Sequence, residues 1–133
     1  IPTSAIRDEG TSYHYQPVSD EISLDPHGVE VIESVFKDKG LDYLKGKIWT
    51  TDAPYRETRD KIRRRKEQGC IAVEMECAAL VAAARLRNVM FAQFVYACDN
   101  LDAKVWDQRG LTSRPISQKM RIFEIAMECA IHL

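Results

Sequence analysis

The chain has 133 residues, of which 45% are hydrophobic and 29% are charged, and its formal net charge is −1. This composition is typical of a globular domain rather than a disordered segment, and the length allows one modest domain with its own core. With 19 Lys and Arg against 20 Asp and Glu, there is no overall basic field of the kind that holds nucleic acid or an anionic membrane surface.

No apolar run approaches the ~20 residues that a membrane-spanning helix needs, and no signal peptide is visible. We therefore expect a cytoplasmic protein. The four cysteines are far apart, form no Cys-x-x-Cys pair and have no neighbouring histidines, so they predict neither a metal site nor a disulfide framework. Free thiols in a reducing compartment are the expected state of all four, Cys70, Cys77, Cys98 and Cys129.

The first half of the chain alternates between strand and helix. Residues 3–8 predict a short strand, which a polar loop with several aromatic residues follows. Asp25 and Pro26 are typical of a helix N-cap and a proline at the first helical position. Apolar residues then recur at helical spacing as far as Gly40, which favours a helix end. Residues 44–52 alternate enough to predict a second strand.

The second half repeats this alternation. Residues 55–69 predict a charged helix whose basic cluster lacks interleaved aromatic residues, so we expect a solvated face rather than a phosphate-binding one. A short buried strand at 70–73 leads into an alanine-rich helix at 75–88. The run 89–98 is almost entirely apolar, as expected of a strand covered on both faces. A final helix, 115–133, carries apolar residues that step by four and three.

Alternation of strands and helices predicts βαβ units, a mostly parallel sheet and hence a layered α/β domain. In such sheets, ligands gather at the carboxyl ends of the strands. This rule selects three segments that carry polar or acidic residues directly after apolar runs, namely 50–55, 74–76 and 98–102.

Two acids, Glu74 and Glu76, interrupt an otherwise apolar run, and burying an unpaired carboxylate is costly. Glu76 is expected in the first turn of the following helix, where the helix dipole favours an ionised carboxylate. Such a carboxylate can accept two hydrogen bonds at once, which suits a vicinal diol such as that of ribose. Alternatively, both acids form ion pairs with nearby arginines and cap the helix. The spacing does not decide between these interpretations.

Asp99 ends the predicted strand 89–98, where partial burial would favour its protonated form and let it give a proton to a leaving group. Taken alone, the residues "DNLD" favour the alternative of a turn or N-cap aspartate. Thr51 either lines a pocket or belongs to a turn at the end of its strand. Tyr55 could stack on a base, although an isolated aromatic residue is more often part of a core.

The stretches "AVEMECAAL" and "ACDNLD" resemble the purine/uridine phosphorylase family, which also contains the methylthioadenosine/S-adenosylhomocysteine nucleosidases. The resemblance implies that Glu76 binds the ribose hydroxyls, that Met75 packs under the sugar, and that Glu74 belongs to the same substrate site. It also implies that Asp99 protonates the purine N7 as the glycosidic bond breaks. Asp99 follows Glu76 by 23 positions, which is the family's spacing.

The stretches "AIRDEGTSYHYQP" and "IWTTDAPYRET" resemble uridine phosphorylases, with one departure: Pro54 stands where the family's base-stacking Phe is usual, and Tyr55 is its candidate substitute. Thr51 lies in the same substrate-binding segment. In purine members an arginine after the aspartate assists it, and Arg109 and Arg114 are both near that place. Asp99 indicates a purine substrate, whereas the first fifty residues favour uridine.

The resemblance covers residues 1–133 but corresponds to the C-terminal half of a family member, so we expect a single partial domain of three αβα layers with a mixed, mostly parallel sheet. The family's phosphate-binding elements would lie upstream, and the fragment alone is expected to be inactive. The implied activity is phosphorolysis of a purine or uridine nucleoside by a homo-oligomer, with phosphate as co-substrate and with no cofactor or metal. The alternatives are a hydrolytic nucleosidase and, because of Pro54, a non-catalytic nucleoside-binding module.

Overall fold

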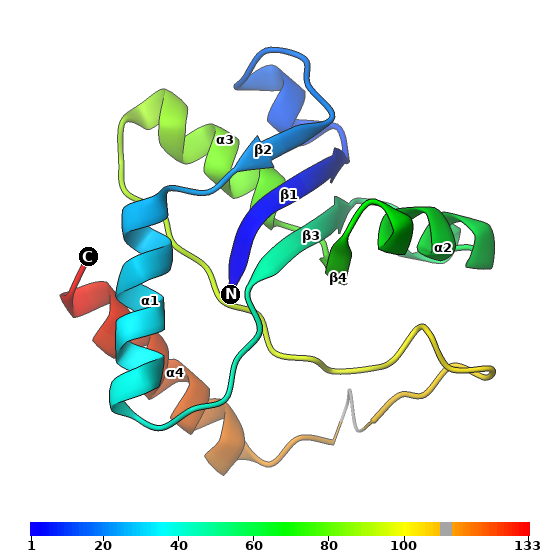
Figure 1. Ribbon diagram of the computed structural model, residues 1–133. Coiled ribbons are helices and arrows are strands. Elements are labelled where there is room, and N and C mark those ends of the chain that lie inside the picture. Colours follow the sequence, from blue (N-terminus) through cyan, green and yellow to red (C-terminus); the bar gives the residue numbers. More distant parts are fainter. Residues whose placement is uncertain (110–112) are drawn as a thin grey trace.

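A computed structural model of the protein describes residues 1–109 and 113–133. Its centre is a four-stranded sheet in the order β2-β1-β3-β4 (Figure 1). The central strands β1 and β3 pair in parallel, as do β3 and β4, whereas β2 runs antiparallel to β1. The mixed, mostly parallel sheet is therefore confirmed. Its strands are β1 (Pro2–Asp8), β2 (Glu21–Ser23), β3 (Gly46–Thr51) and β4 (Cys70–Glu74).

The first helix, α1 (Pro26–Asp38), begins and ends where its local signals predict. The Asp25 carboxylate accepts a hydrogen bond from the His27 N–H at 2.9 Å, which satisfies one of the free donors at the helix start. Pro26 occupies the first turn, where its missing N–H is not needed. Gly40 follows the helix with φ +62°, a left-handed conformation that glycine adopts without steric cost.

The helices α2 (Arg59–Glu67) and α3 (Cys77–Arg87) cover opposite faces of the sheet. Successive side chains of a strand point to opposite faces, and β3 shows this directly. The Thr50 hydroxyl accepts a hydrogen bond from the first turn of α3, at the Ala78 N–H, whereas the ring of Trp49 lies beneath Lys61 of α2. The molecule therefore has three layers, as predicted.

The last helix, α4 (Ile116–Ile131), packs beside α1 at one end of the molecule (Figure 1). Lys39, just after α1, forms an ion pair with Glu128 of α4 at 2.5 Å. The buried side chains of this end continue into the core between the sheet and the helices. The largest fully buried aliphatic residues of that core are Ile32 of α1 and Ile48 of β3, and Ile125 and Cys129 of α4 join the same cluster.

A buried arginine holds the long loop between β1 and β2, which was predicted as a polar loop. Arg7 is only 5% exposed, and its guanidinium donates to the Ser12 hydroxyl at 2.8 Å, the Pro17 carbonyl at 2.7 Å and the Ser19 hydroxyl at 2.8 Å. The guanidinium also lies over the ring of Tyr13 at 4.1 Å. One strand side chain therefore fixes three points of the loop. The loop contains a short 3-10 helix, η1 (Thr11–His14), that the sequence did not predict, and the strand β2 begins within the same predicted loop.

The predicted helix 55–69 begins four residues late. A 3-10 turn, η2 (Pro54–Arg56), comes first, and the Thr58 hydroxyl then accepts from the Lys61 N–H at 3.4 Å as the N-cap of α2. Similarly, α3 begins at Cys77 rather than at residue 75. It ends at Arg87, because Asn88 adopts a left-handed conformation with φ 51° that stops the helix.

The prediction of a strand at 89–98 is wrong. The segment has no sheet partner among the described residues, and it packs instead against α1. The rings of Phe94 and Phe36 meet edge to face with centroids 5.3 Å apart. Ala92 lies so close to Gly28 that a Cβ there would be 2.9 Å from the Cβ of Ala92. The apolar run is only partly buried, and the partly buried Phe91, Ala92 and Phe94 pack against the core without joining the sheet of the described chain.

The four cysteines are free, as predicted, and Cys77 and Cys129 are buried. Burial raises the pKa of both thiols. Within residues 1–109 and 113–133, no helix is both long enough and apolar enough to span a membrane.

Candidate functional site

The carboxyl ends of three parallel strands meet at one edge of the sheet. Asp8 of β1 lies opposite Thr51 of β3, and Thr50 lies opposite Glu74 of β4. Two of the three segments selected from the sequence, 50–55 and 74–76, therefore lie side by side. The chain turns just beyond this edge, where the Asp52 carboxylate accepts from the Gly10 N–H at 3.0 Å and joins the ends of β1 and β3.

Glu74 is bound entirely within the chain. One carboxylate oxygen accepts from the Thr50 hydroxyl at 2.5 Å, and the other accepts from the N–H groups of Glu76 at 2.8 Å and Cys77 at 2.7 Å. The Gln93 side chain approaches the second oxygen at 3.4 Å. A negative charge is favourable at the start of a helix, where free N–H groups gather. Glu74 thus caps α3, as one of the two interpretations proposed, but with backbone N–H groups rather than arginines as its partners.

Glu76 has a different environment. It is the N-cap residue of α3, one position before the first turn in which it was predicted, and its side chain is exposed. Its carboxylate accepts only from the neighbouring Met75 N–H, at 3.3 Å, and no cation pairs with it in the described part of the chain. The ion pair with an arginine that would have explained Glu76 structurally is therefore not formed. Met75 beside it is also exposed, at 44%.

The structure gives Thr51 and Tyr55 contrasting surroundings. Thr51 is fully buried, and its hydroxyl accepts from the Ala53 N–H at 3.3 Å, which is the turn role that the sequence allowed. Tyr55 lies on η2 and is fully exposed, so it is not a core residue.

Asp99 carries one identified hydrogen bond in the described chain. Its Oδ2 accepts from the indole N–H of Trp106 at 2.7 Å. The turn role that "DNLD" favoured belongs to the next residue, since the Asn100 side chain accepts from the Asp102 N–H at 3.0 Å. Asn100 also pairs with Asp107 in an isolated antiparallel bridge, which closes residues 100–107 into a small loop.

A second acid, Glu57, lies within electrostatic range of Asp99, and no motif in the sequence pointed to it. Burial raises the pKa of Glu57, and the charge of Asp99 raises it further, while Lys61 opposes both. Two contacts bring the segments together: Arg59 donates to the Lys104 carbonyl at 2.6 Å, and Lys66 pairs with Asp102 at 2.6 Å. Glu57 looked like one more charge in a charged helix, and only its position in an irregular turn distinguishes it.

The two candidate arginines do not contact Asp99 in the described structure. Arg109 pairs with Asp107 at 3.2 Å. Arg114 donates to the Ala97 carbonyl and lies over the ring of Tyr96 at 4.7 Å. Both are therefore held by other partners near the loop that carries Asp99.

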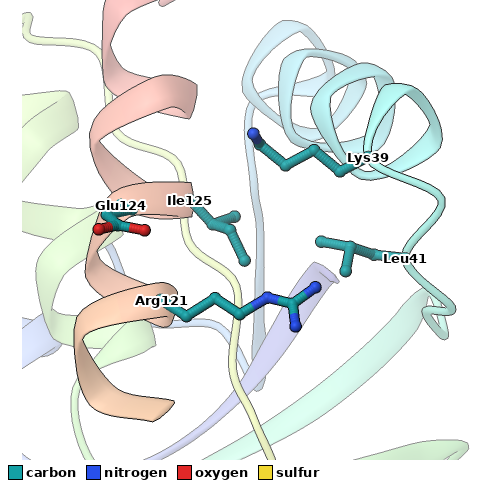
Figure 2. Close-up of a pocket in the computed structure, with 5 residues that line it drawn as sticks. All are labelled: Lys39, Leu41, Arg121, Glu124 and Ile125. Carbon is teal, nitrogen blue, oxygen red and sulfur yellow. The ribbon is translucent and has the colours of Figure 1, made fainter. Parts of the chain in front are cut away.

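Two hollows in the surface lie away from the predicted sugar-binding residues. One, of about 250 Å³, separates the end of α1 from α4 and is lined by Lys39, Leu41, Arg121, Glu124 and Ile125 (Figure 2). The other, of about 400 Å³, lies between α2 and residues 101–103, and Arg59 and Lys66 line it. This second hollow is next to the loop that carries Asp99.

Comparison with known proteins identifies the class. The family model of the phosphorylase superfamily matches residues 1–128, so the chain belongs to that superfamily. An uncharacterized protein of Acanthamoeba polyphaga mimivirus is 32% identical over 95 residues, which are 71% of this chain and 36% of that protein.

Two solved structures are similar in fold, each with a TM-score of 0.60 over 67% of this chain. AMP nucleosidase from Bacteroides thetaiotaomicron is 27% identical, and 40% of its chain is covered. The P. knowlesi homologue of P. falciparum PNP is 19% identical, and 38% of its chain is covered. The protein thus has the fold of nucleoside-cleaving enzymes, and it spans well under half the length of these relatives.

Proposed function

We propose that the protein is a nucleoside phosphorylase that cleaves the N-glycosidic bond of a purine or uridine nucleoside to give the free base and ribose 1-phosphate. One observation carries the proposal. Glu76 presents an exposed carboxylate at a helix start without a cationic partner in the described chain, beside the exposed Met75. An ionised carboxylate in that position is suited to accept both hydroxyls of a ribose.

In this mechanism Glu74 orients the site rather than binding the sugar. Its hydrogen bonds to Thr50 and to the start of α3 fix the backbone on either side of Met75. Glu76 then holds the sugar, so that binding energy is used for orientation. Because Glu74 uses both of its oxygens inside the chain, we place it behind Glu76, with Tyr55 free to stack on the base.

Asp99 would act on the leaving base. As the C1′–N9 bond breaks, its electron pair passes into the purine, and the carboxyl proton of Asp99 moves to N7. Phosphate forms the new bond to C1′. Asp99 has one oxygen on the Trp106 indole, and no partner of its other oxygen is found in the described residues. General acids of this kind contribute about 10²- to 10⁴-fold to a rate.

A hydrolytic nucleosidase is the second candidate, and the likeness to AMP nucleosidase favours it. Water would then take the place of phosphate, with the same sugar and base contacts. Measuring nucleoside cleavage by the full-length protein with and without phosphate separates the two. Phosphorolysis requires that cleavage depends on phosphate and yields ribose 1-phosphate; equal rates without phosphate would contradict it and support hydrolysis. If no nucleoside is cleaved under either condition but nucleosides still bind, the chain is a binding module.

The other parts of the proposal follow from the same activity. Phosphate is the co-substrate, no cofactor or metal takes part, and Arg109 or Arg114 approaches the base when the substrate is bound. We further propose a cytoplasmic homo-oligomer. Gel filtration with light scattering on the full-length protein tests the last point, and a monomer at micromolar concentration would contradict it.

A further inference from the structure

We propose that Trp106 is a positioning residue for the general acid, because its indole N–H fixes the Asp99 carboxyl group with the transferable proton on Oδ1. The inference rests on the proposed function, in which Asp99 gives a proton to the purine N7. It assigns a role to a residue that the sequence analysis did not single out and to which the mechanism above gives no part of its own.

The side chain of Trp106 contacts Asp99 directly. Its indole Nε1–H donates to Oδ2 of Asp99 at 2.7 Å, which is a normal length for a hydrogen bond to a carboxylate. The ring of Trp106 is 53% exposed, so burial of an apolar ring does not account for its place in the structure. The hydrogen bond to Asp99 is the specific interaction that its polar group makes.

The loop after residue 98 brings the two side chains together. Asn100 and Asp107 directly follow Asp99 and Trp106, and they pair in an antiparallel bridge. The Asn100 N–H donates to the Asp107 carbonyl at 2.8 Å in this bridge. The turn between them is attached to α2 by two contacts of 2.6 Å each. The backbone of a closed loop therefore holds the indole against the carboxyl group.

A second pair of the same kind shows what the Trp106 contact leaves open. Trp49, the other tryptophan of the chain, donates to Asp8 at 2.8 Å. Asp8 also forms ion pairs with two cations of α2, at 2.7 and 3.0 Å, and these cations favour its ionised form. Within the described residues, the identified hydrogen-bond partner of Asp99 is a neutral donor. Such a donor orients a carboxyl group without adding a positive charge that would keep it ionised.

The chemistry of the indole decides which oxygen carries the proton. An indole N–H donates and cannot accept, so Oδ2 is the acceptor and a proton on the carboxyl group belongs on Oδ1. When the C1′–N9 bond breaks, its electron pair passes into the purine, the Oδ1 proton moves to N7 and the carboxyl group becomes a carboxylate. The indole then donates to an anion, and a charge-assisted hydrogen bond is stronger than a neutral one. The contact therefore strengthens as the reaction proceeds, which is the condition for acceleration.

The test removes the indole N–H and keeps an aromatic ring, in the full-length protein. Trp106→Phe should lower kcat/KM for a purine nucleoside about 10- to 100-fold, the range for loss of a hydrogen bond to a charged group. Adding this substitution to Asp99→Asn should cause no further loss, because the indole acts only through the carboxyl proton. Losses that multiply in the double variant would overturn the inference while leaving nucleoside cleavage intact.

Trp49→Phe is the matched control, because it removes the same kind of hydrogen bond from Asp8. The kcat/KM of this folded variant should equal that of the wild type. Urea denaturation should show the opposite order: Trp49 is 2% exposed and its variant should be less stable, whereas the exposed Trp106 should be replaced without loss of stability. An equal loss of activity in both variants would overturn the inference.

A binding measurement separates failure of this inference from failure of the proposed function. Calorimetry compares adenine and hypoxanthine with their 7-deaza analogues, in which a C–H group replaces N7 and cannot accept from Asp99. The wild type should bind a purine about 10-fold more tightly than its analogue, and Trp106→Phe should lose that preference. If this result is obtained but no nucleoside is cleaved, only the proposed function is contradicted. No preference in the wild type, or the same preference in Trp106→Phe, overturns the inference.

Discussion

The junction between β4 and α3 and the segment 89–99 have similar sequences and different structures. Each is an apolar run that ends in an acid. At the junction, β4 pairs with β3, and Glu74 accepts hydrogen bonds from the start of α3, a helix that begins three residues later at Cys77. In the other segment the chain packs on α1, and within residues 1–109 and 113–133 it has neither a strand partner nor a helix that begins near Asp99, whose identified partner is Trp106. An acid at the end of an apolar run therefore has a structural role when the backbone N–H groups of a helix start directly after it.

The largest effect is expected from a variant of Asp99. It tests whether Asp99, unlike Glu74, acts in catalysis rather than in holding the fold. Asp99→Asn in the full-length protein should lower purine nucleoside cleavage by about 10²- to 10⁴-fold, because the amide cannot supply the proton to N7. Steady-state kinetics with a purine nucleoside measures this. The folded state should change little, since Asn can still accept from Trp106. Unchanged activity would make Asp99 a loop residue only.

The second prediction tests the structural role of Glu74 as the cap of α3. Thr50→Val removes the hydroxyl that both donates to Glu74 and accepts from Ala78, and it leaves the buried Ala78 N–H and one oxygen of the half-buried Glu74 without that partner. The free energy of unfolding should fall by about 2 kcal/mol, measured by urea denaturation. Thr51→Val is the matched control, because that buried hydroxyl makes one long contact at 3.3 Å. An equal loss in both variants would show that Glu74 is not the cause.

A third prediction tests whether segment 89–98 really packs on α1. Replacing a helical glycine with alanine usually stabilises a helix by about 1 kcal/mol. Here Gly28→Ala should instead destabilise the protein by about 1–2 kcal/mol, because the new Cβ would lie 2.9 Å from Ala92. Adding Ala92→Gly should recover most of the loss, and a double-mutant cycle by urea denaturation measures the coupling. A more stable single variant would show that the segment does not pack there.

The smallest effect is expected on the face of the sheet that α2 covers. There, Asp8 joins β1 to α2, the helix that also contacts the loop carrying Asp99. Asp8 accepts from Trp49 at 2.8 Å and pairs with Lys61 at 2.7 Å and Arg65 at 3.0 Å. Burial alone would raise the pKa of Asp8, but these partners outweigh it and lower the pKa below the usual 3.8.

A carboxyl group whose pKa is lowered by folding stabilises the protein above its unfolded pKa, and this contribution is lost as the pH falls through the folded value. Asp8→Asn should therefore lower the free energy of unfolding by about 1 kcal/mol at pH 7, a modest value because the pair is partly solvated. Urea titrations should show the difference from the wild type shrinking below pH 4. A difference that is constant with pH would assign it to packing instead.

Local chemistry explains what the sequence predicted well. The start and end of α1 depend on Asp25, Pro26 and Gly40, whose preferences act within a few residues. The parallel order of β1 and β3 follows from the helix between them. The proximity of Thr51 to the β4–α3 junction then follows from the sheet, since parallel strands end at a common edge.

The sequence predictions were wrong where the local structure depends on residues that are distant in the sequence. The apolar run 89–98 was predicted as a strand covered on both faces, but it is only partly buried and does not pair, because pairing depends on which strand edge lies beside it. The late start of α2 follows from competition between Pro54, which opens η2, and the Thr58 cap. Glu57 could not be separated from its charged neighbours, because its nearness to Asp99 depends on contacts 36 and 45 positions apart.

The guanidinium of Arg7 has a consequence for how the β1–β2 connection comes apart. Its hydrogen bonds anchor residues 12, 17 and 19 to a single point on a central strand, so displacement of this one side chain releases all three residues together. We expect the amides of residues 11–19 to exchange with deuterium together, as one cooperative unit. Lysine at position 7 could not reproduce this, because a single ammonium cannot span the fork that the planar group offers.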